Sequence, residues 1–111
     1  MTKLTLHPMK ELRIIVQGEN LKYVTDMLID IDTSGYTIFD NISGKGHHGV
    51  HASRSGGLYN EMEGLVMVLS VVPEEKVDPI LSGLAPIFGK NTGVVFVSDV
   101  SVSRKEYFDK K

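Results

Sequence analysis

Residues 65–72 read LVMVLSVV, an almost uninterrupted apolar run that ends at Pro73. Its length and β-branched residues predict a strand, and the lack of polar alternation predicts that both faces of this strand are covered. Pro73 suits the first turn of a following helix, where its missing N–H costs nothing, and Glu74 and Glu75 suit the positive end of that helix. We therefore expect a buried strand that leads directly into a helix.

The residues after this strand continue the pattern of helix, turn and strand. Apolar residues recur at helical spacing at Val77, Ile80, Leu81, Leu84 and Phe88. Pro79 and Pro86 disturb this pattern, and Pro79 indicates either a later helix start, with Asp78 as the cap, or a kink. Residues 89–93 are a glycine-bounded turn, and a last strand is expected from Val94 to Val97, continuing more weakly to residue 102.

The residues before the apolar run predict a matching half. Residues 12–16 form a short β-branched run that predicts a strand, and Asn20 is placed to cap a helix. Apolar residues at helical spacing follow at Leu21, Val24, Met27, Leu28 and Ile31. We expect this helix to stop within residues 30–35, with Gly35 as a left-handed cap, and a second strand to cover residues 36–39.

The resulting order is strand, helix, strand, long connection, strand, helix, strand. Because each helix follows a strand, right-handed crossovers place both helices on one face of an antiparallel four-stranded sheet, in an α+β fold. The helices then cover only that face, although residues 65–72 are apolar on both sides. Self-association is the simplest way to bury the second face.

The long connection, residues 43–63, has no sustained periodicity. It contains Gly44, Gly46, Gly49, Gly56 and Gly57, three of the four histidines, Lys45 and Arg54. Connections longer than roughly 12–15 residues are uncommon in compact domains and are usually functional or disordered. We expect a flexible ligand or partner loop over residues 40–63.

Length and composition limit the classes of protein. The 111 residues suit one domain, residues 1–111, and the net charge of -2 gives no basic field for nucleic acid. The absence of cysteine excludes disulfides, thiolate metal sites and a cysteine nucleophile. No apolar run approaches the roughly 20 residues that span a bilayer, and residues 1–8 lack a signal-peptide core. We expect a cytoplasmic protein that is not embedded in a membrane.

These segments, in this order, resemble the PII signalling superfamily. The resemblance covers residues 12–104 and is carried by Gly35-Tyr36-Thr37, the long loop, Val71-Val72-Pro73 and the turn Gly89–Gly93 before the last strand. Residues 43–46 (SGKG) and 54–57 (RSGG) are similar to the inorganic-carbon branch, which includes bicarbonate-transporter-associated and carboxysome-associated PII-like proteins. In this family the long loop is called the T-loop, and the turn at residues 89–93 is the B-loop.

The resemblance implies a ferredoxin-like homotrimer with nucleotide clefts between subunits. It implies ADP or AMP as the ligand, with ATP and cyclic AMP as alternatives and bicarbonate as a second ligand. It also implies a T-loop that signals to a protein target, here a transporter or a carboxysome-related partner. The nucleotide-binding residues implied are Gly35, Tyr36, Thr37, Arg54, Gly89, Lys90, Asn91, Thr92, Gly93, Arg104 and Lys105.

Several features depart from the pattern usual in PII proteins. The T-loop is longer and lacks the tyrosine-bearing modification motif, since Tyr59 comes late in it. The B-loop is shorter and lacks an acidic residue, and the basic pair of the last strand is reduced to Arg104-Lys105. The cysteine-containing redox tail of the transporter-associated relatives is absent. This absence favours the carboxysome-associated type.

Each candidate residue also has a simpler structural interpretation. Glycines in the turn at residues 89–93 let backbone N–H groups approach a phosphate beside the charge of Lys90, but they also suit a helix C-cap and an ordinary turn. Arg54 can clamp a phosphate in a bidentate manner or remain a solvated loop arginine. Arg104 and Lys105 can reach a phosphate or form a solvated tail.

Other classes of function stay open at this stage. His47, His48 and His51 suggest a metal-binding or metal-tolerance protein, or a loop that senses pH near neutrality, but a glycine-rich loop does not hold ligands rigidly. No carboxylate or cysteine stands close to these histidines in sequence, and we therefore predict no metal site. We also predict no catalytic residues, since no nucleophile–base pair or carboxylate pair is close in sequence. A nitrogen-signalling PII protein and a purely structural trimer are the remaining alternatives.

Overall fold

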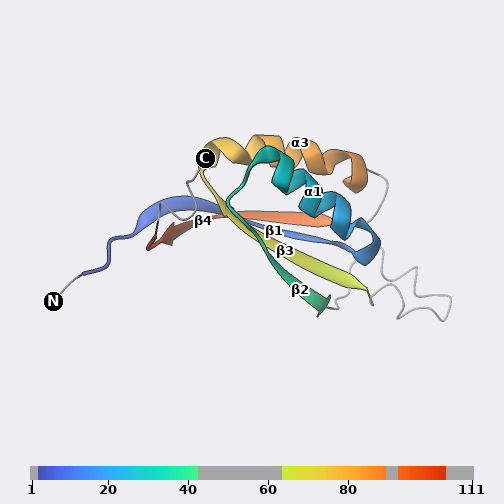
Figure 1. Ribbon diagram of the computed structural model, residues 1–111, viewed down its shortest axis with the longest axis horizontal. Helices are drawn as coiled ribbons and strands as arrows, with labels where there is room; N and C mark the ends of the chain where they lie inside the picture. Colours follow the sequence, from blue (N-terminus) through green and yellow to red (C-terminus); the bar gives the residue numbers. More distant parts are fainter. Residues whose placement is uncertain (1–2, 43–63, 90–92, 105–111) are drawn as a thin grey trace.

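A computed structural model of the chain describes residues 3–42, 64–89 and 93–104. The described strands form one antiparallel sheet in the order β2-β3-β1-β4, and both helices lie on the same face of it (Figure 1). The elements in chain order are β1 (His7–Gln17), η1 (Gly18–Asn20), α1 (Leu21–Ile31), β2 (Thr37–Ile42), β3 (Leu65–Val72), η3 (Glu74–Lys76), α3 (Val77–Phe88) and β4 (Val94–Val102). This arrangement confirms the predicted antiparallel α+β fold with the order βαββαβ.

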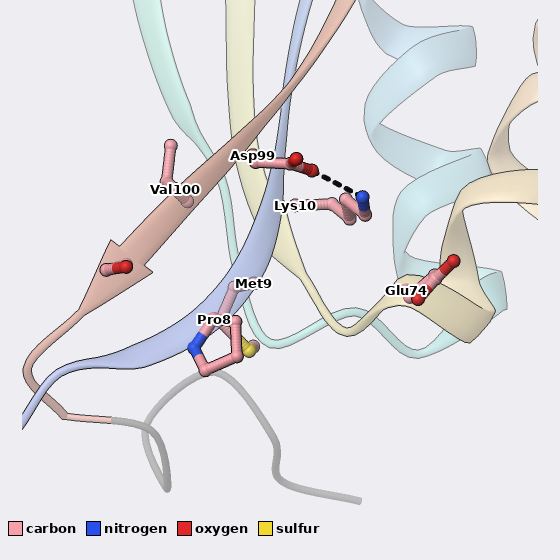
Figure 2. A pocket seen from close by; sticks show the side chains of 7 residues that line it. Pro8, Met9, Lys10, Glu74, Asp99 and Val100 are labelled. Carbon is pink, nitrogen blue, oxygen red and sulfur yellow. Dashed lines mark hydrogen bonds and ion pairs between the residues drawn. The ribbon is translucent and has the colours of Figure 1, made fainter.

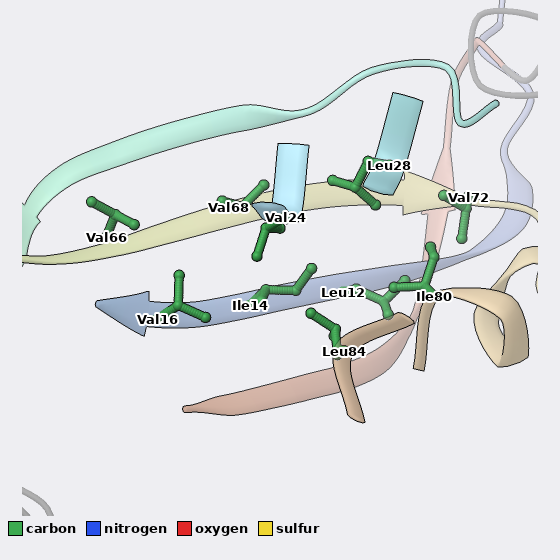
Figure 3. Close-up of a cluster of buried hydrophobic side chains, with 10 residues drawn as sticks. All are labelled: Leu12, Ile14, Val16, Val24, Leu28, Val66, Val68, Val72, Ile80 and Leu84. Carbon is green, nitrogen blue, oxygen red and sulfur yellow. The ribbon is translucent and has the colours of Figure 1, made fainter. Parts of the chain in front are cut away.

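The core lies between the helices and the sheet. Alternate residues of β1 and β3 point towards the helices, so that Ile14 and Val68 are paired in register and both fully buried. They meet the apolar stripe of each helix, which is the stripe that the spacing predicted (Figure 3). The cluster consists of Leu12, Ile14, Val16, Val24, Leu28, Val66, Val68, Val72, Ile80 and Leu84.

The two helices contact each other closely at Gly83. A Cβ atom at this position would lie 2.7 Å from Cγ of Met27, so a side chain there would have to displace the Met27 side chain. The hydroxyl of Tyr23 donates a hydrogen bond to the Gly83 carbonyl oxygen at 2.8 Å. The absence of a side chain at Gly83 therefore leaves room for Met27 between the two helices.

Strand boundaries differ from the predicted ones. β1 begins at His7 rather than at residue 12, because its first residues pair with the end of β4, where His7 is opposite Val102. β2 begins at Thr37 and continues to Ile42, past the predicted start of the loop at residue 40, with an irregularity between Phe39 and Ile42. Backbone pairing with a neighbouring strand extends both elements beyond their apolar segments.

The predicted cap of α1 is wrong, and of the two interpretations of Pro79 the later helix start is excluded. α1 ends at Ile31 and its C-cap is Asp32, which has φ 69° in the left-handed region. Gly35 is not the cap, since Gly64 has the only positive φ among the described glycines. Asp tolerates this conformation better than most residues, and its N–H and that of Thr33 satisfy the last carbonyl groups of α1. α3 begins at Val77, ahead of Pro79, so Asp78 lies inside the helix rather than capping it.

The opposite face of the sheet carries no helix, and we call it the open face. In β3 the residues facing the helices are buried, and those on the open face are only half-buried. The prediction that both faces of β3 are covered therefore holds for one face within a single chain. The open face includes half-buried Met67 and Leu69 and the more exposed Phe39 and Phe96, with Arg13 lying 5.4 Å from the ring centre of Phe96.

Candidate functional site

The segment that joins α1 to β2, together with the first residue of β2, contains three of the predicted nucleotide-binding residues. Gly35, Tyr36 and Thr37 are all exposed at the β2 edge of the sheet, and Thr37 is opposite Leu69 of β3. The segment is nevertheless held firmly at its base. Thr33 binds the Leu28 carbonyl oxygen through both its N–H and its hydroxyl, each at 3.2 Å.

Two further side chains hold the same segment from beneath. The Lys76 ammonium group donates to the Ile31 carbonyl oxygen at 2.8 Å, so the turn before α3 supports the end of α1. The hydroxyl of Ser70, in the middle of β3, donates to the Gly35 carbonyl oxygen at 3.0 Å. Exposed backbone that is fixed in this way is pre-organised to receive a ligand.

Of the predicted B-loop, the structure describes Gly89 and Gly93, and Gly93 leads into β4 at the opposite edge of the sheet. Gly89 ends α3 as its C-cap, in a right-handed conformation, and its N–H donates to the Ala85 carbonyl oxygen at 3.1 Å. Gly93 precedes β4 and packs against Phe88, whose ring atom would lie 2.7 Å from a Cβ at this position. Lys90, Asn91 and Thr92 lie outside the described residues.

Arg104 belongs to the same edge but to its other end. It follows Val102, the last residue of β4, whereas Gly93 precedes Val94, the first residue. A nine-residue strand separates its terminal residues by roughly 27 Å. Arg54 and Lys105, the other predicted basic residues, lie outside the described residues.

Among the residues that the structure describes, a single chain therefore does not bring the predicted site residues together. The phosphate groups of one nucleotide lie close to each other, so Gly93 and Arg104 of one chain cannot both contact them. Thr37 in β2 is separated from β4 by β3 and β1, roughly 14 Å across the sheet. Residues that sit at opposite edges of one chain can meet only where the edges of two copies come together.

A cavity of about 450 Å³ lies where β1 begins and β4 ends (Figure 2). Lys10 forms an ion pair there with Asp99 of β4, and Glu74 of η3 lines the same cavity. The hydrogen bond to Asp99 raises the pKa of Lys10, and the negative charges of Asp99 and Glu74 act in the same direction. Sequence reasoning missed these residues, because strand pairing alone brings Lys10 next to Asp99.

The alternative based on metal binding has no support in the part of the chain that the structure describes. Among residues 3–42, 64–89 and 93–104, no group of three or more His, Asp or Glu side chains is placed to hold a metal ion. The candidate ligands His47, His48 and His51 lie outside these ranges. Within the same ranges, no helix has the length and apolar character needed to cross a bilayer.

The sheet topology and the distribution of the candidate site residues define the class of protein. It is a ferredoxin-like α+β domain with candidate ligand-binding residues at the two edges of its sheet. The model of the family described as nitrogen regulatory protein P-II matches residues 9–107, and the chain belongs to this family. This result confirms the resemblance to the PII superfamily. No curated protein matches the chain.

Solved structures of a PII-like protein are similar to this chain over nearly its whole length. CPII from Thiomonas intermedia K12, bound to ADP, AMP and acetate, is 40% identical, with a TM-score of 0.81 and coverage of 96% of this chain and 100% of that one. CPII bound to ADP and bicarbonate is 39% identical, with a TM-score of 0.80 and coverage of 96% and 99%. A putative PII-like signalling protein from Thermus thermophilus is 23% identical, with a TM-score of 0.73 and coverage of 95% and 99%, which supports the fold alone.

Proposed function

We propose that this chain is a regulatory protein that binds an adenine nucleotide, ADP or AMP in preference, in clefts between the subunits of a homotrimer. The observation that carries the proposal is the identity of about 40% to a protein for which there are solved structures with bound ADP, together with AMP in one and bicarbonate in another. The separation of the predicted residues supports a cleft between subunits. The β2 edge of one copy would supply Gly35–Thr37, and neighbouring edges would supply the B-loop and Arg104.

Homotrimer formation also accounts for the open face. Leu69 and Met67 are half-buried there in a single chain, and Phe96 is 46% exposed. Burying such a surface between copies removes apolar area from water, at about 25 cal/mol for each Å². The simplest partner for this face is therefore the same face of another copy, with the nucleotide clefts at the rims where sheet edges meet.

The proposed mechanism is one of binding and signalling, with no catalytic step. The B-loop at residues 89–93 would hold phosphate through backbone N–H groups and Lys90, and Arg54 would close over the phosphates from the T-loop. Ligand binding would then order the T-loop, about residues 40–63 of this single domain, for a protein target. The target class is a transporter or a carboxysome-related protein of inorganic-carbon metabolism.

Isothermal titration calorimetry with ADP, AMP, ATP and cyclic AMP, each with and without bicarbonate, tests the proposal. We expect ADP or AMP to bind most tightly, and bicarbonate to change the affinity for the nucleotide. The variant Lys90→Ala should weaken ADP binding by about tenfold, roughly 1.4 kcal/mol. Lys22→Ala, which removes an exposed cation on α1, serves as the matched control and should leave the affinity unchanged. Absence of heat with every nucleotide would overturn the proposal.

The family's description as nitrogen regulatory favours one alternative, signalling in nitrogen metabolism. The same titrations separate the two, because only the inorganic-carbon proposal requires bicarbonate to alter nucleotide binding. Genes for carboxysome components, Rubisco or bicarbonate transporters beside this gene would support inorganic carbon. Genes for ammonium transporters or glutamine synthetase would support nitrogen signalling.

A further inference from the structure

Ser70 is the one polar residue among the fully buried positions of the described chain. It is 1% exposed and lies on the helix-facing side of β3, where Val66, Val68 and Val72 occupy the equivalent positions. A hydroxyl group buried without a hydrogen-bond partner destabilises a fold, whereas valine would fit the pattern of this strand. A serine at this position therefore calls for an explanation beyond packing.

The hydroxyl of Ser70 is satisfied by one contact, 35 positions away in sequence. It donates to the carbonyl oxygen of Gly35 at 3.0 Å, and Gly35 lies in the segment that joins α1 to β2. The other two anchors of this segment, from Thr33 and Lys76, hold the carbonyl oxygens of α1. Of the three anchors, only Ser70 acts directly on a residue of the predicted nucleotide site.

Because the peptide bond is planar, the contact that fixes the Gly35 carbonyl also fixes the N–H of the next residue, Tyr36. The carbonyl group of Gly35 and the N–H group of Tyr36 belong to the same planar trans unit, so they point in opposite directions. Because Ser70 holds the carbonyl oxygen towards the core, the N–H of Tyr36 is directed away from the core, at the exposed β2 edge. A fixed N–H donor at such an edge suits an acceptor oxygen or nitrogen of a bound nucleotide.

We propose that Ser70 is a positioning residue for nucleotide binding: it orients the Gly35–Tyr36 peptide so that the Tyr36 N–H donates to the bound nucleotide. This inference rests on the proposed function and deepens it. Ser70 does not touch the ligand, since it is buried beneath the segment. Ser70 would raise the affinity because the backbone is already held in place, so less conformational entropy is lost when the nucleotide binds.

The test compares three variants in ADP titrations at equal protein concentration. We expect Ser70→Ala to weaken ADP binding by about tenfold, which corresponds to roughly 1.4 kcal/mol. Ser70→Thr keeps the hydroxyl group and should stay within about twofold of the unchanged protein. Val68→Ala is the matched control, because Val68 is fully buried on the same face of β3 and makes no hydrogen bond to the segment. It should lower the melting temperature and leave ADP affinity unchanged.

A second measurement uses the unchanged protein and so does not depend on the folding of a variant. In ¹⁵N-resolved NMR spectra, the amide signal of Tyr36 should be among those that shift most on addition of ADP. In Ser70→Ala this shift should shrink, even at ADP concentrations that saturate the protein. An unmoved Tyr36 amide in the unchanged protein saturated with ADP would overturn the inference.

The outcomes distinguish this inference from the proposed function. If the unchanged protein binds no nucleotide, the proposed function fails. If it binds ADP and Ser70→Ala binds equally well, only the positioning role fails. If Ser70→Ala and Val68→Ala weaken ADP binding to the same extent, Ser70 has a purely structural role and the inference is wrong.

Discussion

The two faces of the sheet are built from the same strands but differ in how far their side chains are buried. On the face under α1 and α3, Ile14 and Val68 are fully buried, and the core is complete within one chain. On the open face, neighbouring residues such as Ile15 and Met67 are only half-buried. One face therefore stabilises the fold of the single chain, and the other has apolar surface available for a second copy. Those predicted ligand residues that the structure describes at the sheet edges, such as Thr37 and Gly93, lie where these two faces meet.

The largest expected difference between the faces concerns the stability of the single chain. Ile14→Ala removes a fully buried side chain and should lower the free energy of unfolding by about 2–5 kcal/mol at every protein concentration. Ile15→Ala, its neighbour on the open face, should have an effect that grows at concentrations where the protein self-associates. Urea unfolding followed by circular dichroism at several concentrations measures both. If both variants lose the same free energy of unfolding, with the same dependence on protein concentration, the two faces do not differ in the proposed way.

The next effect concerns self-association through the open face. Phe96→Asp places a charge where Phe96 is 46% exposed beside Arg13, and it should weaken association by about 2 kcal/mol or more per contact. Light scattering after size-exclusion chromatography should then report monomers in place of trimers, with an unchanged circular dichroism spectrum. Ile29→Asp is the control, because Ile29 lies on α1 and is 61% exposed. A trimer that persists in Phe96→Asp would place the interface elsewhere.

The smallest expected effect concerns the ion pair at the border of the face that the helices cover. Lys10 and Asp99 lie on the same face of the sheet as Leu12, but their side chains line the cavity rather than the hydrophobic core. Their contact raises the pKa of Lys10 from its ordinary 10.5, so its contribution to stability is complete below pH 10.5 and is lost as pH rises through the higher folded-state pKa. Asp99→Asn should therefore cause a small drop in melting temperature that is constant between about pH 7 and 9 and shrinks above pH 10.5.

A double-mutant comparison isolates this contact from other effects of pH. In a Lys10→Met background, Asp99→Asn should cause no pH-dependent change, since the group that titrates is gone. Thermal unfolding of the four proteins across the same pH range provides the data. A drop that persists undiminished at high pH would mean that Asp99 stabilises the fold through something other than Lys10.

Local patterns predicted the elements well and their boundaries less well. The spacing of Val24 and Leu28 correctly identified the buried stripe of α1, because helical periodicity is a property of nearby residues. Gly35 was the obvious candidate for a helix cap, yet Asp32 takes the left-handed conformation. Propensity favours glycine there, but the contacts that tie the end of α1 to Thr33 and Lys76 decide the actual position.

The candidate site was predictable only in part, for a similar reason. The glycines at 35, 89 and 93 are visible in the sequence as turn residues, and the resemblance to PII proteins assigns them to a nucleotide site. The anchoring role of Ser70 was not predicted, because a serine within an apolar strand gives no indication of a partner 35 positions away. The ion pair of Lys10 with Asp99 likewise depends on strand register.

The sequence by itself determined the order of the elements, the stripe that each helix buries and the family to which the chain belongs. These properties follow from local periodicity and from motifs of a few residues. Only the tertiary structure decided that Gly93 and Arg104 lie at opposite ends of one edge, that Gly35 is held by Ser70, and that the second face of the sheet stays open. Such facts depend on contacts between residues far apart in the chain, and hydrophobic patterning does not encode which distant residues meet.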